Sequence, residues 1–249
     1  MTGAKGTFWE HLDVLRWSII RSLGVTAAFA IVAFCLKDKL FALVLAPRSS
    51  DFVTYRLLDV EPFNLHLMNT GLTEQFMTHM RMAVYAGLLF AAPYIIYELF
   101  RFVSPGLYAN ERRAGLWVVV SSYLMFMAGT VLNYLLIFPF TLRFLGTYQV
   151  SPDVDNMLTL QSYADTFISM SLVMGIVFQL PVICILLGRM GLISGRLMAR
   201  YRRHAVVAIL IVAAIITPTT DVFTLFVVAL PIYLLYEVSI GIVRITKRH

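Results

Sequence analysis

Six long apolar segments alternate with polar stretches along this chain of 249 residues. A window of about 19 residues, enough to cross a hydrocarbon core of about 30 Å as a helix, places them at residues 17–36, 82–100, 114–138, 166–187, 205–219 and 222–243. Each segment predicts a transmembrane helix. We therefore expect an all-α polytopic membrane protein with six transmembrane helices, forming a single integral-membrane domain over residues 1–249.

The last two segments share one apolar block, which Thr217-Pro218-Thr219-Thr220-Asp221 interrupts. Proline breaks helical hydrogen bonding and an anionic side chain is costly in lipid, so these residues predict a tight hairpin between two short spans. Fifteen residues rise only about 22 Å as a helix. The fifth span is therefore expected to thin the bilayer locally or to lie behind its neighbours.

Two of the polar connections are long, at residues 37–81 and 139–165. Loops of this length usually fold or carry function, so we expect short amphipathic helices that cap the extracytoplasmic face. The remaining polar segments are an N-terminal helix at 1–16, loops at 101–113 and 188–204, and a tail at 244–249. The chain shows no internal repeat, which argues against an inverted-repeat transporter.

Composition supports a membrane protein, with 59% hydrophobic and 14% charged residues and a mean hydropathy of +0.80. Soluble globular domains carry about 25% charged residues, so these values exclude an ordinary soluble domain.

Cys35 and Cys184 lie in separate apolar runs. We interpret them as small buried hydrophobic residues and not as a disulfide or a metal-binding pair.

The net charge of +6 is distributed unevenly between the two sides of the predicted membrane topology. In a membrane protein such an excess indicates that the loops on the two sides of the membrane carry different numbers of basic residues. It gives little support to nucleic-acid binding. One side receives six basic residues: Lys37, Lys39, Arg48, Arg56, Arg81 and Arg143. The other side receives 14, Arg16 and Arg21 among them. Both termini are therefore predicted to be cytoplasmic.

The motifs of soluble enzymes are absent from the sequence. It contains no HExxH, GxSxG, GxGxxG or CxxC, and no Gly-Lys pair that could end a phosphate-binding loop. The five histidines all fall in predicted loops or at span ends, which does not favour three convergent metal ligands. We therefore expect no enzymatic activity, no metal and no cofactor.

The few polar residues inside the predicted spans are informative, because polar groups at membrane depth usually face protein or water. Gln179 is the deepest, and either a packing hydrogen bond or a functional contact would explain it. Pro181 follows it and can kink the same helix. Glu98 and Glu237 end spans two and six, where the helix dipole disfavours them. We expect a nearby arginine, such as Arg101 or Arg244, to offset each charge.

Two cytoplasmic segments carry sharper patterns. The helix before span one places Glu10, Asp13 and Trp17 on one face and Leu12, Leu15 and Ile19 on another, which predicts an amphipathic helix with an acidic face. An interfacial anchor through Trp9 and Trp17 is the alternative. Between spans two and three, Pro105-Gly106 predicts a turn, and Asn110 can cap a helix that opens at Glu111.

Taken in order, these segments resemble the core subunit of the twin-arginine protein translocase, the TatC family. The matching blocks cover nearly the whole chain, and their order makes them specific together. They are Glu10 to Arg16, Ala46-Pro47, Phe102 to Arg113, Phe178-Gln179-Leu180-Pro181, Ile216-Thr217-Pro218 with Asp221, Leu230-Pro231-Ile232, and Leu235-Tyr236-Glu237.

The resemblance implies a receptor in the bacterial cytoplasmic (inner) membrane that binds twin-arginine signal peptides of folded proteins. It also implies recruitment of the single-span partners TatA and TatB for export driven by the proton-motive force, in a homo-oligomer within a larger complex. It implies no role in binding nucleic acid. The implied signal-peptide site comprises Glu111 as its main carboxylate with Phe102, Pro105, Tyr108, Arg112 and Arg113 around it, and Glu10, Asp13, Leu15 and Arg16 on the N-terminal helix. The implied partner-helix contacts are Gln179, Pro181, Thr217, Pro218 and Asp221, and the implied structural residues are Pro47, Glu98 and Glu237.

Three positions depart from the family pattern. Val14 stands where His-Leu-x-Glu-Leu-Arg places a second signal-binding glutamate, and Asp13 lies about 100° around the helix from it. Gln179 stands where a glutamate is frequent, so it can hydrogen-bond but not titrate. Leu225 replaces the usual glutamine after Asp221. We therefore expect Glu111 to act alone, or with Asp13 or Glu10 as a shifted second carboxylate.

Two other functions stay open from the residues alone. A small-solute or ion transporter predicts several ionisable residues near the midplane of different spans, whereas this chain offers mainly Gln179. An intramembrane enzyme predicts a nucleophile with its base, or metal ligands, at membrane depth. Neither pattern is visible, so the translocase receptor is the favoured interpretation.

Overall fold

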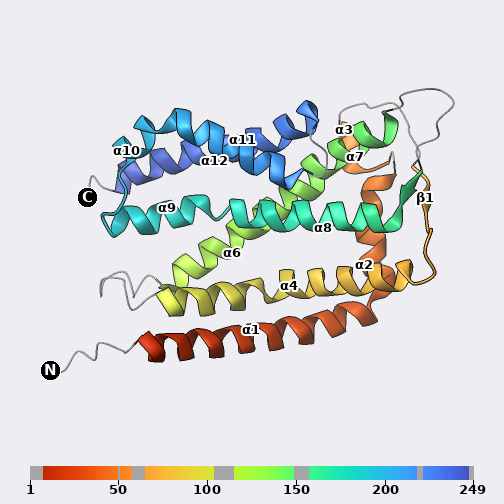
Figure 1. The fold of residues 1–249 in the computed structure, drawn as a ribbon, viewed down its shortest axis with the longest axis horizontal. Coiled ribbons are helices and arrows are strands. Elements are labelled where there is room, and N and C mark those ends of the chain that lie inside the picture. Colours follow the sequence, from red (N-terminus) through yellow and green to blue (C-terminus); the bar gives the residue numbers. More distant parts are fainter. Residues whose placement is uncertain are drawn as a thin grey trace. The chain divides into compact units, whose positions relative to one another are not determined.

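The structure, a computed structural model, describes residues 8–49, 51–57, 65–103, 115–148, 157–217 and 221–246. These residues are mainly helical, as predicted (Figure 1). The elements are α1 (Phe8–Cys35), α2 (Lys37–Val44), η1 (Ala46–Arg48), α3 (Val53–Leu57), β1 (Leu67–Met68), α4 (Glu74–Val103), α6 (Gly115–Leu132), η3 (Asn133–Ile137), α7 (Phe138–Thr147), β2 (Leu158–Thr159), α8 (Leu160–Val177), α9 (Leu180–Arg189), α10 (Gly195–Arg200), α11 (Arg202–Ile216) and α12 (Val222–Thr246).

Among the described residues, five helical stretches are long and apolar enough to cross a membrane. They are Leu12–Cys35, Glu74–Phe102, Gly115–Thr147, Leu160–Arg189 and Val222–Ile245. Helix α11 has only 15 residues, or about 22 Å, in line with the short fifth span expected. The expectation that both last spans are short is wrong for α12, which has 25 residues. Helix α11 ends at Ile216, whereas α12 continues past Pro231, which lies inside it.

Several helices extend beyond the apolar windows, because backbone hydrogen bonding continues into their polar ends. Helix α1 begins at Phe8, so the predicted N-terminal helix and span one form one continuous helix. Helix α4 begins at Glu74 and α8 at Leu160, which shortens both outer loops. Within the first loop, α2, η1 and α3 form the short helices that its length predicted.

Proline marks two interruptions along the membrane-spanning stretches. The fourth stretch breaks at Phe178–Gln179, between α8 and α9, because Pro181 at the start of α9 has no amide hydrogen and its ring clashes with the preceding turn. The predicted kink is therefore a local break. In the third stretch a π-helical turn, η3, precedes α7, which carries Pro139 in its first turn.

The two outer loops meet through a parallel pairing of β1 with β2, in which Leu67 aligns with Leu158 and Met68 with Thr159. The buried carboxylate of Glu74 supports this pairing. It accepts hydrogen bonds from the backbone N–H of Thr70 at 2.8 Å and of Gly71 at 3.0 Å, and through its other oxygen from that of Gln161 at 3.0 Å. The start of α4 is thereby joined to the start of α8.

The contacts divide the chain into two compact units: residues 1–37 with 79–123, and residues 38–78 with 124–249. The first unit contains α1 and most of α4. The second contains the helices from η3 to α12 and the outer helices α2 and α3. Its core is formed by Phe138, Tyr163 and Phe167, whose rings pack edge to face, with Met170 and Met174 fully buried.

Candidate functional site

In the first unit, α1 and α4 form an antiparallel pair (Figure 1). Ser18 contacts Glu98, while further along the pair the ring of Phe34 stacks on that of His79 with centroids 4.0 Å apart. Between these contacts the helices approach closely, because a Cβ on Gly87 would lie 2.6 Å from the amide nitrogen of Ala30. The absent side chain at Gly87 therefore sets the spacing of the two helices.

A polar cluster around Glu98 ties these helices together near the end of α4. The Glu98 carboxylate, 3% exposed, accepts hydrogen bonds from Ser18 Oγ at 2.9 Å and from Tyr94 Oη at 3.0 Å, and forms an ion pair with Arg21 Nη1 at 3.2 Å. We expected Arg101 on the same helix to offset the charge of Glu98. Arg101 does contribute an attractive charge, but the ion pair itself is formed by Arg21 of α1. A buried carboxylate is stable only when such donors surround it.

Sequence reasoning missed Arg21, which it assigned to the cytoplasmic flank of span one. Arg21 lies inside the apolar stretch Leu12–Cys35. The signal was present, because an arginine within an apolar segment is costly unless it finds a partner. What the sequence could not supply was the identity of that partner, which lies 77 positions further along the chain.

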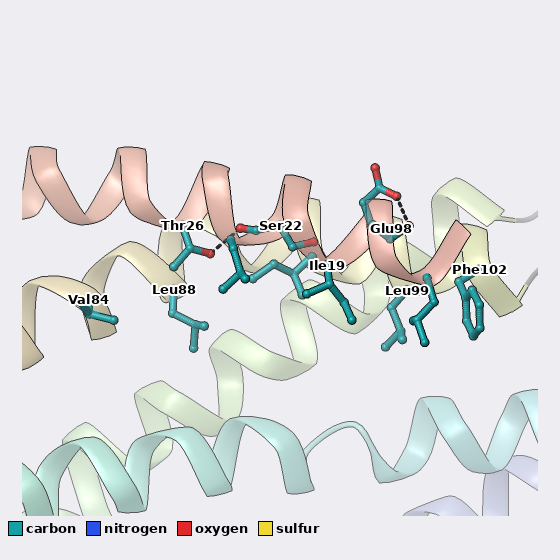
Figure 2. A pocket seen from close by; sticks show the side chains of 12 residues that line it. Ile19, Ser22, Thr26, Val84, Leu88, Glu98, Leu99 and Phe102 are labelled. Carbon is teal, nitrogen blue, oxygen red and sulfur yellow. Dashed lines mark hydrogen bonds between the residues drawn. The ribbon is translucent and has the colours of Figure 1, made fainter. Parts of the chain in front are cut away.

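A groove with a volume of 370 Å³ runs along the face of this helix pair (Figure 2). Figure 2 shows Phe102 at one end of the row of lining side chains and Val84 at the other. The groove is lined by Leu15, Ser18, Ile19, Ser22, Leu23 and Thr26 of α1 and by Val84, Leu88, Ile95, Glu98, Leu99 and Phe102 of α4. The structure thus brings together Leu15, Glu98 and Phe102, which the sequence singled out in separate segments.

The other residues of the expected signal-peptide site are only partly described. Asp13, Val14 and Arg16 are exposed on α1. The side chain of Glu10 lies outside the described residues, as do Pro105, Tyr108, Glu111, Arg112 and Arg113. In the chain, residues 104–114 directly follow α4, the helix that contributes Phe102 to the groove.

The second unit contains the expected partner-helix contacts. Gln179, partly buried, occupies the break before α9, and Pro181 is buried at the start of that helix. The Thr217 hydroxyl donates to the carbonyl of Ala213 at 3.0 Å. Asp221 caps α12 by accepting a hydrogen bond from the backbone N–H of Thr224 at 2.7 Å. Pro218 lies outside the described residues. Helix α9 packs on α12, and α11 packs on α12 and α8.

Glu237 on α12 repeats the arrangement found around Glu98. It pairs with Arg202 of α11 at 2.7 Å, and Tyr233, one turn earlier on its own helix, donates to it at 3.2 Å. We expected Arg244 as the partner, but the structure places Arg202 there. In both clusters a tyrosine four residues before the glutamate donates to it, and an arginine from another helix pairs with it. The expectation that Glu237 ends its helix is wrong, because α12 continues to Thr246.

Pro47 belongs to a buried arrangement in the second unit. The Tyr55 hydroxyl lies 3.2 Å from the carbonyl oxygen of Pro47 and 2.9 Å from that of Pro139. Burial raises the pKa of Tyr55 above its ordinary value. Thr54 donates to the carbonyl of Leu135 close by. These contacts join α3 to η1, to the π-helical segment and to the start of α7.

Similarity to known proteins extends over nearly the whole chain. The model of the family described as TatC, Sec-independent protein translocase protein, matches residues 10–231. The Sec-independent protein translocase protein TatC of Koribacter versatilis (strain Ellin345) is 36% identical over 95% of this chain and 84% of its own length. That of Deinococcus radiodurans is 33% identical over 98% of this chain and 88% of its own. A crystal structure of the twin-arginine translocase receptor TatC superposes with a TM-score of 0.79 at 28% identity, covering 94% of this chain and 99% of that one.

Proposed function

Because the chain belongs to the TatC family, and is therefore a membrane component of the twin-arginine protein translocase, we propose that it is the subunit that binds twin-arginine signal peptides. A TatC protein acts in protein transport together with other Tat subunits. We place its binding site at the cytoplasmic face of the bacterial inner membrane. One observation supports this site above others: Leu15 and Phe102, expected signal-peptide contacts from distant segments, line one groove.

Recognition of the twin arginines depends on the attraction between their positive charges and carboxylates of this chain. A pair of guanidinium groups needs fixed carboxylates, and a bidentate arginine–carboxylate contact is among the stronger charge-assisted hydrogen bonds. We assign the main carboxylate to Glu111 and a weaker second one to Asp13, which is exposed on α1. Glu98 is unsuited to this task, because Ser18, Tyr94 and Arg21 already occupy its oxygens.

Substitution of the two carboxylates tests the assignment. Glu111→Ala should abolish export of a twin-arginine cargo while the protein remains in the membrane, and Asp13→Ala should impair export less. Val14→Glu, which restores the family residue on α1, should tighten signal-peptide binding. Export and crosslinking of the signal peptide are the measurements, and Asp38→Ala, an exposed acidic residue on α2, is the matched control.

The alternative to a binding role is that Arg112 and Arg113 hold Glu111 in an exposed ion pair, which would contribute only about 0–1 kcal/mol to stability. Wild-type binding and export by Glu111→Ala, together with failure of Asp13→Ala or Glu10→Ala, would place the recognition carboxylate on α1 instead.

We further propose that spans four, five and six recruit the single-span partners TatA and TatB, for passage driven by the proton-motive force. Gln179 would face a groove formed by these spans and hydrogen-bond to a partner helix. The packing of α9 on α12, and of α11 on both α8 and α12, supports this proposal, because the three spans adjoin within one unit.

A further inference from the structure

The segment between α9 and α11 carries positive charge that no acidic residue of the segment balances. The chain contains no aspartate or glutamate from residue 166 to residue 220. The exposed arginines at this end of the second unit are Arg189, Arg196, Arg200, Arg202, Arg203 and Arg244. Among the described residues, only Arg202 of this set has an acidic partner, Glu237. The remaining arginines are therefore available to an anion from outside the chain.

Helix α10 holds two of these arginines on a fixed face. It packs on α12 (Figure 1). Met198 is buried in that contact, and the Tyr236 hydroxyl donates to its carbonyl at 2.9 Å. Arg196 and Arg200 are four residues apart, so they are neighbours on the exposed side of the helix. Because α10 is already docked, its backbone need not be ordered when a ligand binds.

A third arginine reaches the start of α10 from α12. A Cβ on Gly195 would collide with Cγ of Arg244, so the absent side chain makes room for the stem of this arginine. Arg203 follows directly after α10, at the start of α11. We refer to Arg196, Arg200, Arg203 and Arg244 as the arginine cluster. Two helix ends and α10 thus contribute to one basic surface.

The arginine cluster lies where membrane-spanning helices end. Helix α9 closes the fourth apolar stretch at Arg189, and α11, the short fifth span, begins at Arg202. The count of basic residues predicts that this side is cytoplasmic. The negative surface potential of a cytoplasmic leaflet attracts basic segments beside a span, by about fivefold in affinity for each arginine or lysine. Lipid phosphates are therefore the anions nearest to this surface.

Exposed apolar side chains accompany the arginines. Leu197, on the exposed side of α10, is 43% exposed, and Val207 of α11 is 57% exposed. Tyr201, between the two helices, is also exposed, and tyrosine is enriched at the level of lipid headgroups. A soluble anion makes no use of such side chains. A phospholipid carries a phosphate and acyl chains together, and the basic surface continues directly into the lipid-facing side of a span.

We propose that the arginine cluster binds the headgroup phosphate of an anionic phospholipid whose acyl chains lie along α11. A planar guanidinium group fits phosphate oxygens in bidentate geometry, and residues 188–204 contain arginine but no lysine. Orientation in the membrane would be served by lysine equally well, because the charge bias counts both residues. The site lies apart from the residues assigned to the signal peptide, so either assignment can fail without the other.

Native mass spectrometry of the full chain, purified in detergent, measures lipid binding directly. The double variant Arg196→Gln with Arg200→Gln is compared with Arg48→Gln and Arg56→Gln together, which remove the same charge from exposed positions of the same unit outside the cluster. The probes are phosphatidylglycerol, phosphatidylcholine with the same acyl chains, and glycerol 3-phosphate, which lacks the chains.

We expect the wild type and the control variant to bind phosphatidylglycerol at least tenfold more tightly than phosphatidylcholine. The variant without Arg196 and Arg200 should lose about 25-fold in affinity for phosphatidylglycerol, fivefold for each arginine. Equal affinity for the two lipids, or equal losses in the two double variants, would overturn the proposal. Binding of glycerol 3-phosphate as tight as that of the lipid would make this a site for soluble phosphate and would also overturn it.

The apolar part of the site has its own test. Leu197→Ser should weaken binding of phosphatidylglycerol several-fold, because contact with the acyl chains is lost, whereas Leu57→Ser at an exposed position of α3 should not. Equal affinities of these two variants would contradict the proposed course of the chains. In intact membranes, a photo-crosslinking side chain at position 197 should react with lipid. Crosslinks to a protein in place of lipid would make the arginine cluster a protein-docking surface and overturn the proposal.

Discussion

At the residue scale, Glu98 of α4 and Glu237 of α12 are each stabilised by residues from two helices. Glu98 has Tyr94 on its own helix and Arg21 on α1, and Glu237 has Tyr233 and Arg202. A carboxylate that is largely removed from water needs hydrogen-bond donors or an opposite charge beside it, and these residues supply both. Both ion pairs also join helices, which makes them contacts of tertiary structure as well as local compensation.

Removal of Arg21 should therefore destabilise the protein more than removal of the whole ion pair. Arg21→Leu leaves the buried Glu98 carboxylate without its ion pair, whereas Arg21→Leu combined with Glu98→Leu removes the buried carboxylate as well. We expect the double variant to recover part of the stability that Arg21→Leu loses. The coupling free energy between the two substitutions should be about 1 kcal/mol or more. Thermal unfolding of the purified protein in detergent measures it; additive effects of the two substitutions would show that the pair is not coupled.

At the element scale, prolines have opposite effects in different helices. Pro93 and Pro231 lie inside α4 and α12, which continue past them, whereas Pro181 follows the break between α8 and α9. Proline always removes one hydrogen bond, but neighbouring groups can satisfy the carbonyl that it frees. At Gln179 the break leaves a polar side chain, partly buried, in the middle of the fourth membrane stretch, where a partner helix could bond to it.

Gln179→Leu should weaken association with the single-span partners and leave signal-peptide binding intact. A polar contact within the membrane contributes about 0.6–2 kcal/mol, so we expect a threefold to about thirtyfold loss of partner affinity. Crosslinking of partner helices from α11 or α12 is the measurement. Gln161→Leu, an exposed glutamine at the start of α8, serves as the control. Unchanged crosslinking in Gln179→Leu would make Gln179 a packing residue.

At the scale of the whole molecule, α11 decides the topology. Five long apolar helices would place the two termini on opposite sides of the membrane. A sixth crossing by α11, short as it is, returns the C-terminus to the side of the N-terminus. The distribution of basic residues, 14 against six, favours this arrangement, because cytoplasmic loops carry the excess of lysine and arginine.

Cysteine-accessibility labelling of intact cells tests this topology. In a chain without Cys35 and Cys184, single cysteines at positions 3, 110 and 198 should resist an impermeant reagent, whereas cysteines near Ser50 and Asp153 should react. Labelling after cell disruption controls for burial: a position is counted as protected only if it reacts once the cells are broken. The reverse pattern would show that the molecule has the opposite orientation. Reaction of a cysteine at position 249, while a cysteine at 198 is protected, would show that α11 does not cross.

The sequence by itself determined the long helices and the family. Lipid requires backbone groups to be satisfied within a helix, so length and hydropathy, which are local properties, suffice to find a span. Ordered motif blocks likewise lie along the chain and can be compared directly. Leu15 and Phe102 each belong to such a block, and the blocks alone assign both residues to the expected signal-peptide site.

Only the tertiary structure decided which side chains meet. The partners of Glu98 and Glu237, the pairing of β1 with β2 and the bonds of Glu74 join residues far apart in the chain, and no periodicity links such residues. Strands of two residues leave no alternation to detect. The groove, too, is lined by side chains of both α1 and α4, two helices that approach closely at Gly87 and Ala30. Packing between helices sets this geometry, and a single helix in the sequence does not contain it.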